Sequence, residues 1–383
     1  MMTLYRLPAL YMRGGTSKGL FFNEADLPDD PALRHALLIR AVGSPDPYGA
    51  QMDGMGTGIS STSKVVILRR STQPDCDVDY WFGHVDIQRG TLDESGNCGN
   101  LSAAVGPAAL LMGLLPAQGE QIDIRIWQQN LGQRIIATVP LQQGWPACEG
   151  DFKLDGLAFP GAAIQLAYLD PAGQSAGLFP TGQPLDILHL PDGNTLEATL
   201  LDCSNPLILV RAVDLGLNGT ELPVEINADA GLLARLETIR ASGAVAMGLA
   251  RTVAEASQLR PATPKLALLS TAQDYASTTG EPVQHEEQHL TARILSMGKL
   301  HHAFTGTGSL ALAVATLIPG TLAHALSRPV DGGLVRFGHP SGYNEVDATV
   351  ESVAGQWQVR QVNMTRTARC LMQGVVWVPL EEH

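Results

Sequence analysis

The fold is most clearly indicated by the stretch Ser95-Gly96-Asn97-Cys98-Gly99-Asn100, which is followed by an apolar run of small residues over 101–115. Glycines on both sides of the cysteine predict a tight loop that leads into a buried helix, with Cys98 at or next to its N-terminus. The free amide hydrogens and the positive dipole end of such a helix stabilise a thiolate and bind carboxylates. Cys98 is therefore a candidate reactive thiol beside an anion-binding turn. A small buried cysteine without a chemical role is the alternative.

Composition limits the classes of protein to which the chain can belong. Its 383 residues are 45% hydrophobic, which suits two domains with ordinary cores. The formal net charge of −13 argues against a nucleic-acid partner or an anionic membrane surface. The five cysteines are scattered and form no CxxC pair, so a zinc ribbon or a disulfide framework is not expected. The first residues lack the pattern of a signal peptide, and the apolar run over 101–115 is too short for a membrane span. We therefore expect a cytoplasmic protein.

Short β-like runs bounded by turn residues alternate with helical segments along the chain. Proline at the first position and Asp29-Asp30 before it predict a helix over 31–42. Glycine and proline accumulate around 180–184, which predicts a domain boundary there, with domains 1–184 and 185–383. In this division the last strand of the second domain packs back on the first. The predicted strands of the first domain cover residues 64–68, 78–82, 122–127 and 134–139.

The two halves repeat one order of elements. In the first half, the strand over 64–68 precedes the turn with Cys98 and its apolar helix. In the second, a strand over 264–269 precedes Thr305-Gly306-Thr307-Gly308-Ser309 and an apolar helix over 310–318. This order predicts an internal duplication. Two glycine turns that each open a helix could then bind one polyanion from both sides of a cleft.

Lys64 stands where the polar loop Ser60-Ser61-Thr62-Ser63 meets an apolar strand. A lysine that points into a cleft there is partly desolvated and gives up its proton more readily, as a general base requires. The alternative is a lysine at the edge of a strand in water.

Three further polar turns are candidates for binding an anion. Arg13-Gly14-Gly15-Thr16-Ser17-Lys18-Gly19 lacks the spacing of a P-loop, so a simple hairpin turn is the alternative to a ligand site. Gly338-His339-Pro340-Ser341-Gly342 can present an imidazole and a hydroxyl, although the histidine can equally hydrogen-bond within its own loop. Asn205, before Pro206, can bind a carboxylate or simply form a turn. The remaining histidines fit surface positions better than a metal site.

These turns occur in an order that resembles the PrpF family, which includes methylaconitate, methylitaconate and oxalomesaconate isomerases. The resemblance covers nearly the whole chain. The motifs that carry it are residues 12–19, 43–49, 61–64, 95–100 and 338–342, together with the closing Arg366-Thr367-Ala368-Arg369. Residues 43–49 and 60–64 are more similar to the methylaconitate branch.

The resemblance implies an α/β (α+β) fold like that of diaminopimelate epimerase, with two pseudo-symmetric domains, each a sheet wrapped around a central helix. It implies no cofactor and no metal, and it places Lys64 and Cys98 on the two acid/base positions. The expected partner is a small anionic carboxylic acid, and a homodimer is compatible with the sequence. The expected substrate-binding residues are Gly15, Thr16, Ser17, Ser63, Asn97, Gly99, Asn100, Asn205, Thr307, Gly308, Ser309, His339 and Ser341.

The leading hypothesis is an isomerase that moves a proton along an allylic or keto–enol system in an unsaturated di- or tricarboxylate. Lys64 would take the proton, and Lys64 or Cys98 would return it. A non-catalytic accessory protein of a metabolic enzyme is one alternative. A racemase or epimerase with paired thiols is another, although Thr307-Gly308-Ser309 stands where epimerases of this fold carry their second cysteine.

Overall fold

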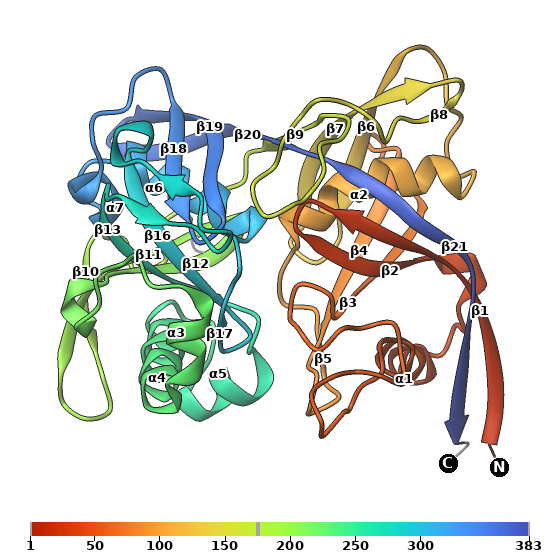
Figure 1. Cartoon of the computed structure of the whole chain (residues 1–383), viewed down its shortest axis with the longest axis horizontal. Coiled ribbons are helices and arrows are strands. Elements are labelled where there is room, and N and C mark those ends of the chain that lie inside the picture. Colours follow the sequence, from red (N-terminus) through yellow and green to blue (C-terminus); the bar gives the residue numbers. More distant parts are fainter. Residues whose placement is uncertain (1, 174–176, 382–383) are drawn as a thin grey trace. The chain divides into compact units, whose positions relative to one another are not determined.

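The computed structural model of the chain describes residues 2–173 and 177–381, which divide into two compact units (Figure 1). Unit 1 contains Met1–Leu166 and Arg366–His383, and unit 2 contains Ala167–Thr365. The division falls earlier than the boundary predicted at residue 184, because the turn-forming residues there belong to a loop within unit 2. The last strand, β21 (Ala368–Glu381), pairs antiparallel along β1 (Met2–Gly14) and so belongs to unit 1.

Unit 1 is built on a mixed sheet. Along the chain, β1 pairs with β2 antiparallel, β2 with β3 parallel, β3 with β4 antiparallel, β4 with β6 parallel, and β6 with β7 antiparallel. Each parallel pair requires a crossover, and helices α1 and α2 lie in these two crossovers. After β1, the elements are β2 (Ser17–Asn23), α1 (Pro31–Val42), β3 (Lys64–Arg70), β4 (Val78–Val85), β5 (Leu92–Asp93), α2 (Gly99–Leu111), β6 (Gln121–Gln128), β7 (Gln133–Gln142), β8 (Trp145–Pro146) and β9 (Ile164–Leu169), which crosses the unit boundary.

Unit 2 repeats the same order of pairings. β11 pairs with β12 antiparallel, β12 with β13 parallel, β13 with β16 antiparallel, β16 with β18 parallel, and β18 with β19 antiparallel. The strands of unit 2 are β10 (Asp186–His189), β11 (Thr195–Cys203), β12 (Asn205–Arg211), β13 (Lys265–Thr271), β14 (Tyr275–Ala276), β15 (Pro282–Val283), β16 (Leu290–Ser296), β17 (Lys299–Leu300), β18 (Leu334–His339), β19 (Gly342–Val353) and β20 (Gln356–Arg366). Its helices are α3 (Pro223–Ala228), α4 (Ala230–Ala246), α5 (Val253–Leu259), α6 (Gly306–Leu317) and α7 (Leu322–Leu326). The α/β fold with a duplicated sheet is confirmed.

A central apolar helix lies against the sheet of each unit, as the sequence predicts. In α2 every residue from Gly99 to Leu110 is buried, and in α6 every residue from Gly306 to Thr316 is buried. A helix that is apolar on all sides is stable only when protein surrounds it. Small residues let the strands approach α2 closely, since a Cβ on Gly106 would lie 2.7 Å from Val139 Cγ2. The composition of α2 therefore accounts for its central position.

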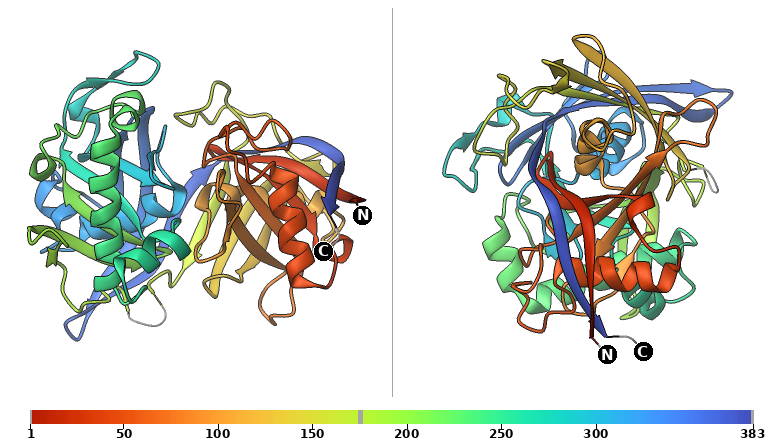
Figure 2. Two further views of the ribbon diagram at one scale, coloured as in Figure 1. Left: turned by 90° about the horizontal axis from the view of Figure 1, so that it is seen from below. Right: turned by 90° about the vertical axis from the view of Figure 1, so that its right-hand side faces the viewer.

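A second helix covers the other face of each sheet, as the left-hand view of Figure 2 shows for α1 and α4. Helix α1 spans the predicted residues, with the Asp30 carboxylate accepting the Ala32 amide at 3.1 Å. Leu37 and Leu38 of α1 belong to a core cluster with Phe22 of β2 and Val65 of β3. The sheet of unit 1 is thus buried on both faces, which explains the unbroken apolar run over residues 65–68 in the middle of β3.

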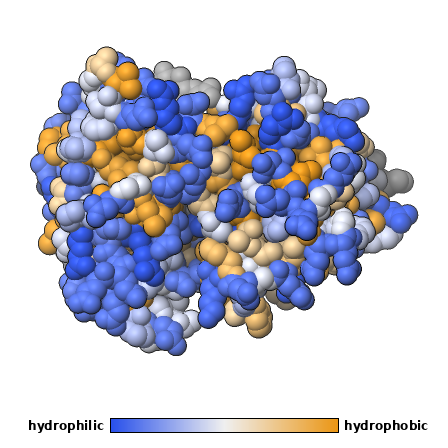
Figure 3. Space-filling model, turned by 90° about the horizontal axis from the view of Figure 1, so that it is seen from above, coloured by the Kyte–Doolittle hydropathy of each residue, from blue (hydrophilic) through white to orange (hydrophobic). Residues whose placement is uncertain are grey.

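On the face drawn in Figure 3, exposed apolar side chains lie between polar ones. Tyr48, Met52 and Phe159 are among the large apolar residues that remain exposed. No helix within residues 2–173 and 177–381 is long and apolar enough to cross a membrane.

Gly14 provides a test of how closely β1 packs against α2. A Cβ there would lie 2.6 Å from the backbone oxygen of Asn100 and 3.0 Å from Leu101 Cα, and backbone atoms cannot move aside as a side chain can. We predict that Gly14→Ala lowers the free energy of unfolding by about 1–3 kcal/mol, measured by urea denaturation. Gly374→Ala in β21 is the matched control, because a Cβ at that position would meet no atom within 4 Å. Equal stability of the two variants would contradict this account of the packing.

Candidate functional site

Two predicted residues, Lys64 and Cys98, lie side by side in unit 1. Lys64 is the first residue of β3, and Cys98 is the N-cap of α2. Lys64 Nζ lies 3.3 Å from Cys98 Sγ and 2.9 Å from Ser17 Oγ, at the start of β2. Ser17, Lys64 and Cys98 are 1%, 6% and 7% exposed. The structure thus brings an amine, a thiol and a hydroxyl from three elements into one buried group.

Close packing of the β1–β2 hairpin produces this group. Gly14 and Gly19 both face α2, because a Cβ on Gly19 would lie 3.2 Å from Leu101 Cδ1. Gly14 pairs directly with Ser17, so the Ser17 side chain projects from the same face of the sheet toward α2. Two glycines therefore bring Ser17 within hydrogen-bond distance of the lysine.

The position of Cys98 at the helix terminus directs its sulfur toward polar partners. Cys98 Sγ accepts the Leu101 amide at 3.4 Å, as an N-cap side chain does. Helix α2 has 13 residues, so its unpaired amides and its dipole present positive charge at this end. Among the residues the structure describes, Lys64 forms no ion pair with a carboxylate. The group formed by Ser17, Lys64 and Cys98 can exchange protons between the lysine nitrogen, the cysteine sulfur and a bound acid. The positive charge at this end of α2 favours binding of an anion beside the group.

Asn100, the second residue of α2, connects the N-terminal turn of this helix to two distant segments of the chain. Its amide nitrogen donates to Thr16 Oγ1 at 3.0 Å, and its carbonyl oxygen accepts from Arg366 Nε at 3.2 Å. Gly15 has φ +48° and lies against the Asn100 side chain, so a larger residue does not fit there. Thr16 and Asn100, two of the predicted substrate-binding residues, are thus in direct contact.

Arg366 is a part of this turn that the sequence analysis did not identify. It is 2% exposed and lies 266 positions from the asparagine that it contacts. Its only sequence signal is its place in the closing Arg366-Thr367-Ala368-Arg369, which carries no chemistry by itself. Its guanidinium places a permanent positive charge beside the N-terminal turn of α2.

The remaining candidates of unit 1 differ in what their side chains contact. Gly99 is the first residue of α2, and the neighbouring Asn97 is 3% exposed. The Ser63 hydroxyl lies 2.8 Å from Gln51 Oε1 and 2.9 Å from the Ile59 carbonyl. Ser63 therefore stabilises its own loop, together with Gln51, a residue that the sequence analysis did not single out.

The N-terminus of α6 in unit 2 gathers the second set of predicted residues. Asn205 Nδ2 donates to Thr307 Oγ1 at 2.7 Å, and Asn344 Nδ2 donates to Ser309 Oγ at 2.7 Å. Gly308 lies between them, where a Cβ would meet the Thr305 hydroxyl. Within the described parts of the chain, that buried hydroxyl has no hydrogen-bond partner. The turn is thus suited to an anion, and Asn344 is a polar contributor that its motif did not reveal.

His339 and Ser341 make contacts within and near their own turn, the alternative that the sequence left open. His339 Nε2 lies 3.0 Å from the Tyr343 carbonyl, and its Nδ1 accepts the Ser341 amide at 3.2 Å. The Ser341 hydroxyl donates to the His302 carbonyl at 2.6 Å. These bonds hold the turn in place, and a contact of either residue with a substrate stays a prediction.

No cysteine occurs at the start of α6, and the one on the neighbouring strand is unsuited to proton transfer. Cys203 is the last residue of β11 and is completely buried. Burial, with a smaller effect of Asp202, raises the pKa of the Cys203 thiol far above its ordinary value. A thiol that resists ionisation is a poor acid–base group.

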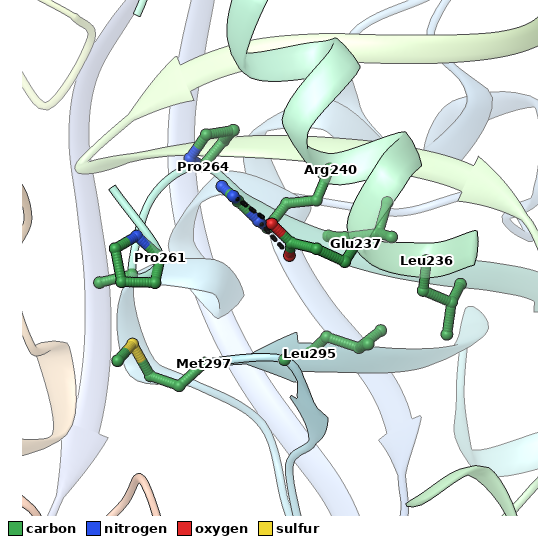
Figure 4. A pocket seen from close by; sticks show the side chains of 10 residues that line it. Leu236, Glu237, Arg240, Pro261, Pro264, Leu295 and Met297 are labelled. Carbon is green, nitrogen blue, oxygen red and sulfur yellow. Dashed lines mark hydrogen bonds and ion pairs between the residues drawn. The ribbon is translucent and has the colours of Figure 1, made fainter. Parts of the chain in front are cut away.

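The other features of the described residues do not form a second reaction centre. Within residues 2–173 and 177–381, no group of three His, Cys, Asp or Glu side chains is placed to hold a metal ion. A cavity beneath α4 measures about 10 Å³, which is room for one water at most (Figure 4). Arg240 beside it is held by two hydrogen bonds to Glu237, at 2.8 and 2.7 Å. That cavity is therefore part of the packing.

Comparisons with known proteins identify the family of the chain. The family model described as "PrpF protein" matches residues 4–379. A 2-methyl-aconitate isomerase from Cupriavidus necator is 48% identical over 98% of this chain and 97% of its own length. A 4-oxalomesaconate tautomerase from Pseudomonas putida is 37% identical over 97% of this chain and 96% of its own length.

Solved structures show the same fold. The crystal structure of a methylitaconate-delta-isomerase aligns with a TM-score of 0.78 at 37% identity, covering 98% of this chain and 96% of that one. A hydroxyproline epimerase from Agrobacterium vitis aligns with a TM-score of 0.56 at 13% identity, over 98% of this chain and 93% of that one, and shows the fold alone. The epimerase-like fold expected from the resemblance is confirmed. Because the family model and the isomerases of known name match almost the whole chain, the protein is an isomerase that belongs to the PrpF family.

Proposed function

We propose that this isomerase moves a proton along an allylic or keto–enol system in a small unsaturated di- or tricarboxylate, without a cofactor. The observation that carries the proposal is the buried contact of Lys64 Nζ with Cys98 Sγ and Ser17 Oγ, at 3.3 and 2.9 Å. Such a group supplies a base and a second acid, which is all that an isomerisation without net oxidation requires. The relatives named above act on substrates of this kind, and their names support the choice.

In the proposed mechanism, Lys64 acts first as a neutral amine. It takes a proton from a carbon next to the conjugated system, and the electron pair of that C–H bond moves into the conjugated system to form a dienolate. The amides at the N-terminus of α2 and the Arg366 charge stabilise the carboxylate oxygens on which negative charge develops. Return of a proton to the same carbon after rotation gives a cis–trans isomer, and return to the distant carbon shifts the double bond.

The second acid distinguishes two versions of the mechanism. Lys64 can return the proton on the face from which it was taken, whereas Cys98 would supply it from another direction. Cys98 Sγ already lies within hydrogen-bond distance of both Lys64 Nζ and the Leu101 amide. We propose Cys98 as the second acid/base and Lys64 as the essential base.

Carboxylate binding is the second part of the proposal. Around α2 we assign it to Gly15, Thr16, Ser17, Asn97, Gly99 and Asn100. In unit 2 we assign it to Asn205, Thr307, Gly308 and Ser309, because the α6 turn presents amides and a buried hydroxyl. We also assign it to Ser63, His339 and Ser341, whose hydrogen bonds hold their own loops in place.

The function is tested by incubating the purified protein with 2-methylaconitate, 3-methylitaconate and 4-oxalomesaconate, and following each acid by proton NMR. We expect at least one acid to isomerise, with 2-methylaconitate first, because that relative has the higher identity of the two named above. If none of the three acids reacts, the proposed substrate class is wrong.

Replacing the base gives a sharper test. Lys64→Ala removes the proposed proton acceptor, so kcat for the isomerised acid should fall by about 10²–10⁴-fold, while circular dichroism shows a folded protein. Lys153→Ala removes an exposed lysine of the same unit and should leave kcat unchanged. A Lys64→Ala variant within tenfold of wild-type kcat would refute the assignment.

Cys98→Ser tests whether the thiol is essential. Serine can accept the Leu101 amide at the N-cap, so the helix should still form. We expect this variant to retain more activity than Lys64→Ala, with a loss in kcat below about 10²-fold. Cys148→Ser, at an exposed cysteine, is the matched control. A loss as large as that of Lys64→Ala would instead make the thiol the principal base.

A further inference from the structure

Three cations lie in a row across unit 1, outside the group formed by Lys64 and Cys98. Arg13 of β1 pairs directly with Lys18 of β2 on one side and with Arg369 of β21 on the other. Residues that pair directly in antiparallel strands project from the same face of the sheet. The next residue, Gly14, faces α2, so Arg13 and its two neighbours project from the opposite face. The row therefore lies across the sheet from the proposed reaction centre.

No ion pair within the described parts of the chain neutralises this row. Among residues 2–173 and 177–381, none of the three cations forms an ion pair, although the chain carries a net charge of −13. Like charges directly opposite one another across strands are unfavourable. Burial and the nearby Arg369 charge lower the pKa of Arg13 to about 10. An anion bound there would reduce the repulsion between the cations. It would also replace the hydrogen bonds to water that Arg13 loses on burial.

A hollow lies beside two of these cations. It has a volume of about 480 Å³, and Arg13 and Arg369 both line it. Arg13 uses Nη1 for the carbonyl and the hydroxyl of Thr367, at 2.5 and 2.6 Å, and its guanidinium retains further donors. Two guanidinium groups side by side match the planar, two-oxygen geometry of a carboxylate.

The rest of the hollow is largely apolar. Leu157, Phe159 and Leu371 line it, and Phe159 and Leu371 are 76% and 43% exposed. Glu149 also lines it and carries the one negative charge among its lining residues. With two positive charges and one negative, the lining favours a ligand with a single negative charge.

We propose that this hollow is a second binding site, which takes an organic monocarboxylate with a short apolar tail. The carboxylate lies between Arg13 and Arg369, and the tail packs on Phe159 and Leu371. The site is independent of the isomerisation, because Ser17 and Lys18 are consecutive residues whose side chains leave opposite faces of the sheet.

The test uses hexanoate as the probe and saturation-transfer NMR titration of the full chain. Hexanoate should bind the wild type, and Arg369→Ala should weaken its binding about tenfold, the loss expected for one charged hydrogen-bond partner. Arg369 is exposed, so its replacement should leave the fold intact. Arg235→Ala removes an exposed arginine of α4 and is the matched control, expected to bind hexanoate as the wild type does.

Two further measurements test where hexanoate binds and which parts of it are required for binding. Lys64→Ala should bind hexanoate unchanged, and its loss of binding would place the carboxylate in the reaction centre instead. Acetate and hexanol should each bind the wild type at least about tenfold more weakly than hexanoate, because each lacks one half of the ligand. Equal binding of hexanoate to wild type and Arg369→Ala, or equal binding of hexanol and hexanoate, would overturn the proposal.

Discussion

The close packing of the β1–β2 hairpin on the first turn of α2 is the constraint on which the functional group depends. Gly14 and Gly19 allow this contact, because a Cβ on Gly14 would lie 2.6 Å from the Asn100 backbone oxygen and one on Gly19 would lie 3.2 Å from Leu101 Cδ1. With the hairpin in place, Ser17 reaches Lys64, and Lys64 reaches the sulfur that caps α2. A shift of the hairpin by the width of one methyl group would separate Ser17 Oγ from the Lys64 amine.

Features that depend on local sequence could be predicted. Helix α1 begins and ends as expected because Asp30 and Pro31 define its start and Gly43, in the left-handed region, defines its end. Lys64 is the first residue of its strand for a similar reason, since the polar residues before it form a loop and the apolar ones after it form β3. Cys98 caps α2 because glycine-rich sequence precedes a small apolar helix.

Features that depend on distant parts of the chain could not be predicted. Nothing near Arg366 or Asn344 indicates that these side chains contact Asn100 and Ser309, because only the folded strands bring them together. The division into units depends on such distant contacts too: glycine and proline near residue 184 indicate a loop, but not which unit contains it. The hydrogen bonds of His339 to the backbone of its own turn likewise became visible only in the folded chain.

The most direct test of Lys64 as the proton carrier is isomerisation by the wild type in heavy water, with deuterium in the product counted by mass spectrometry. A lysine amine holds two solvent-derived hydrogens beside the one it abstracts, so even a proton returned by the same nitrogen is diluted by solvent. The account therefore predicts that most product molecules carry deuterium at the newly protonated carbon. A product that retains its original hydrogen throughout would contradict it, because a lone thiol or a direct shift would return the same hydrogen undiluted.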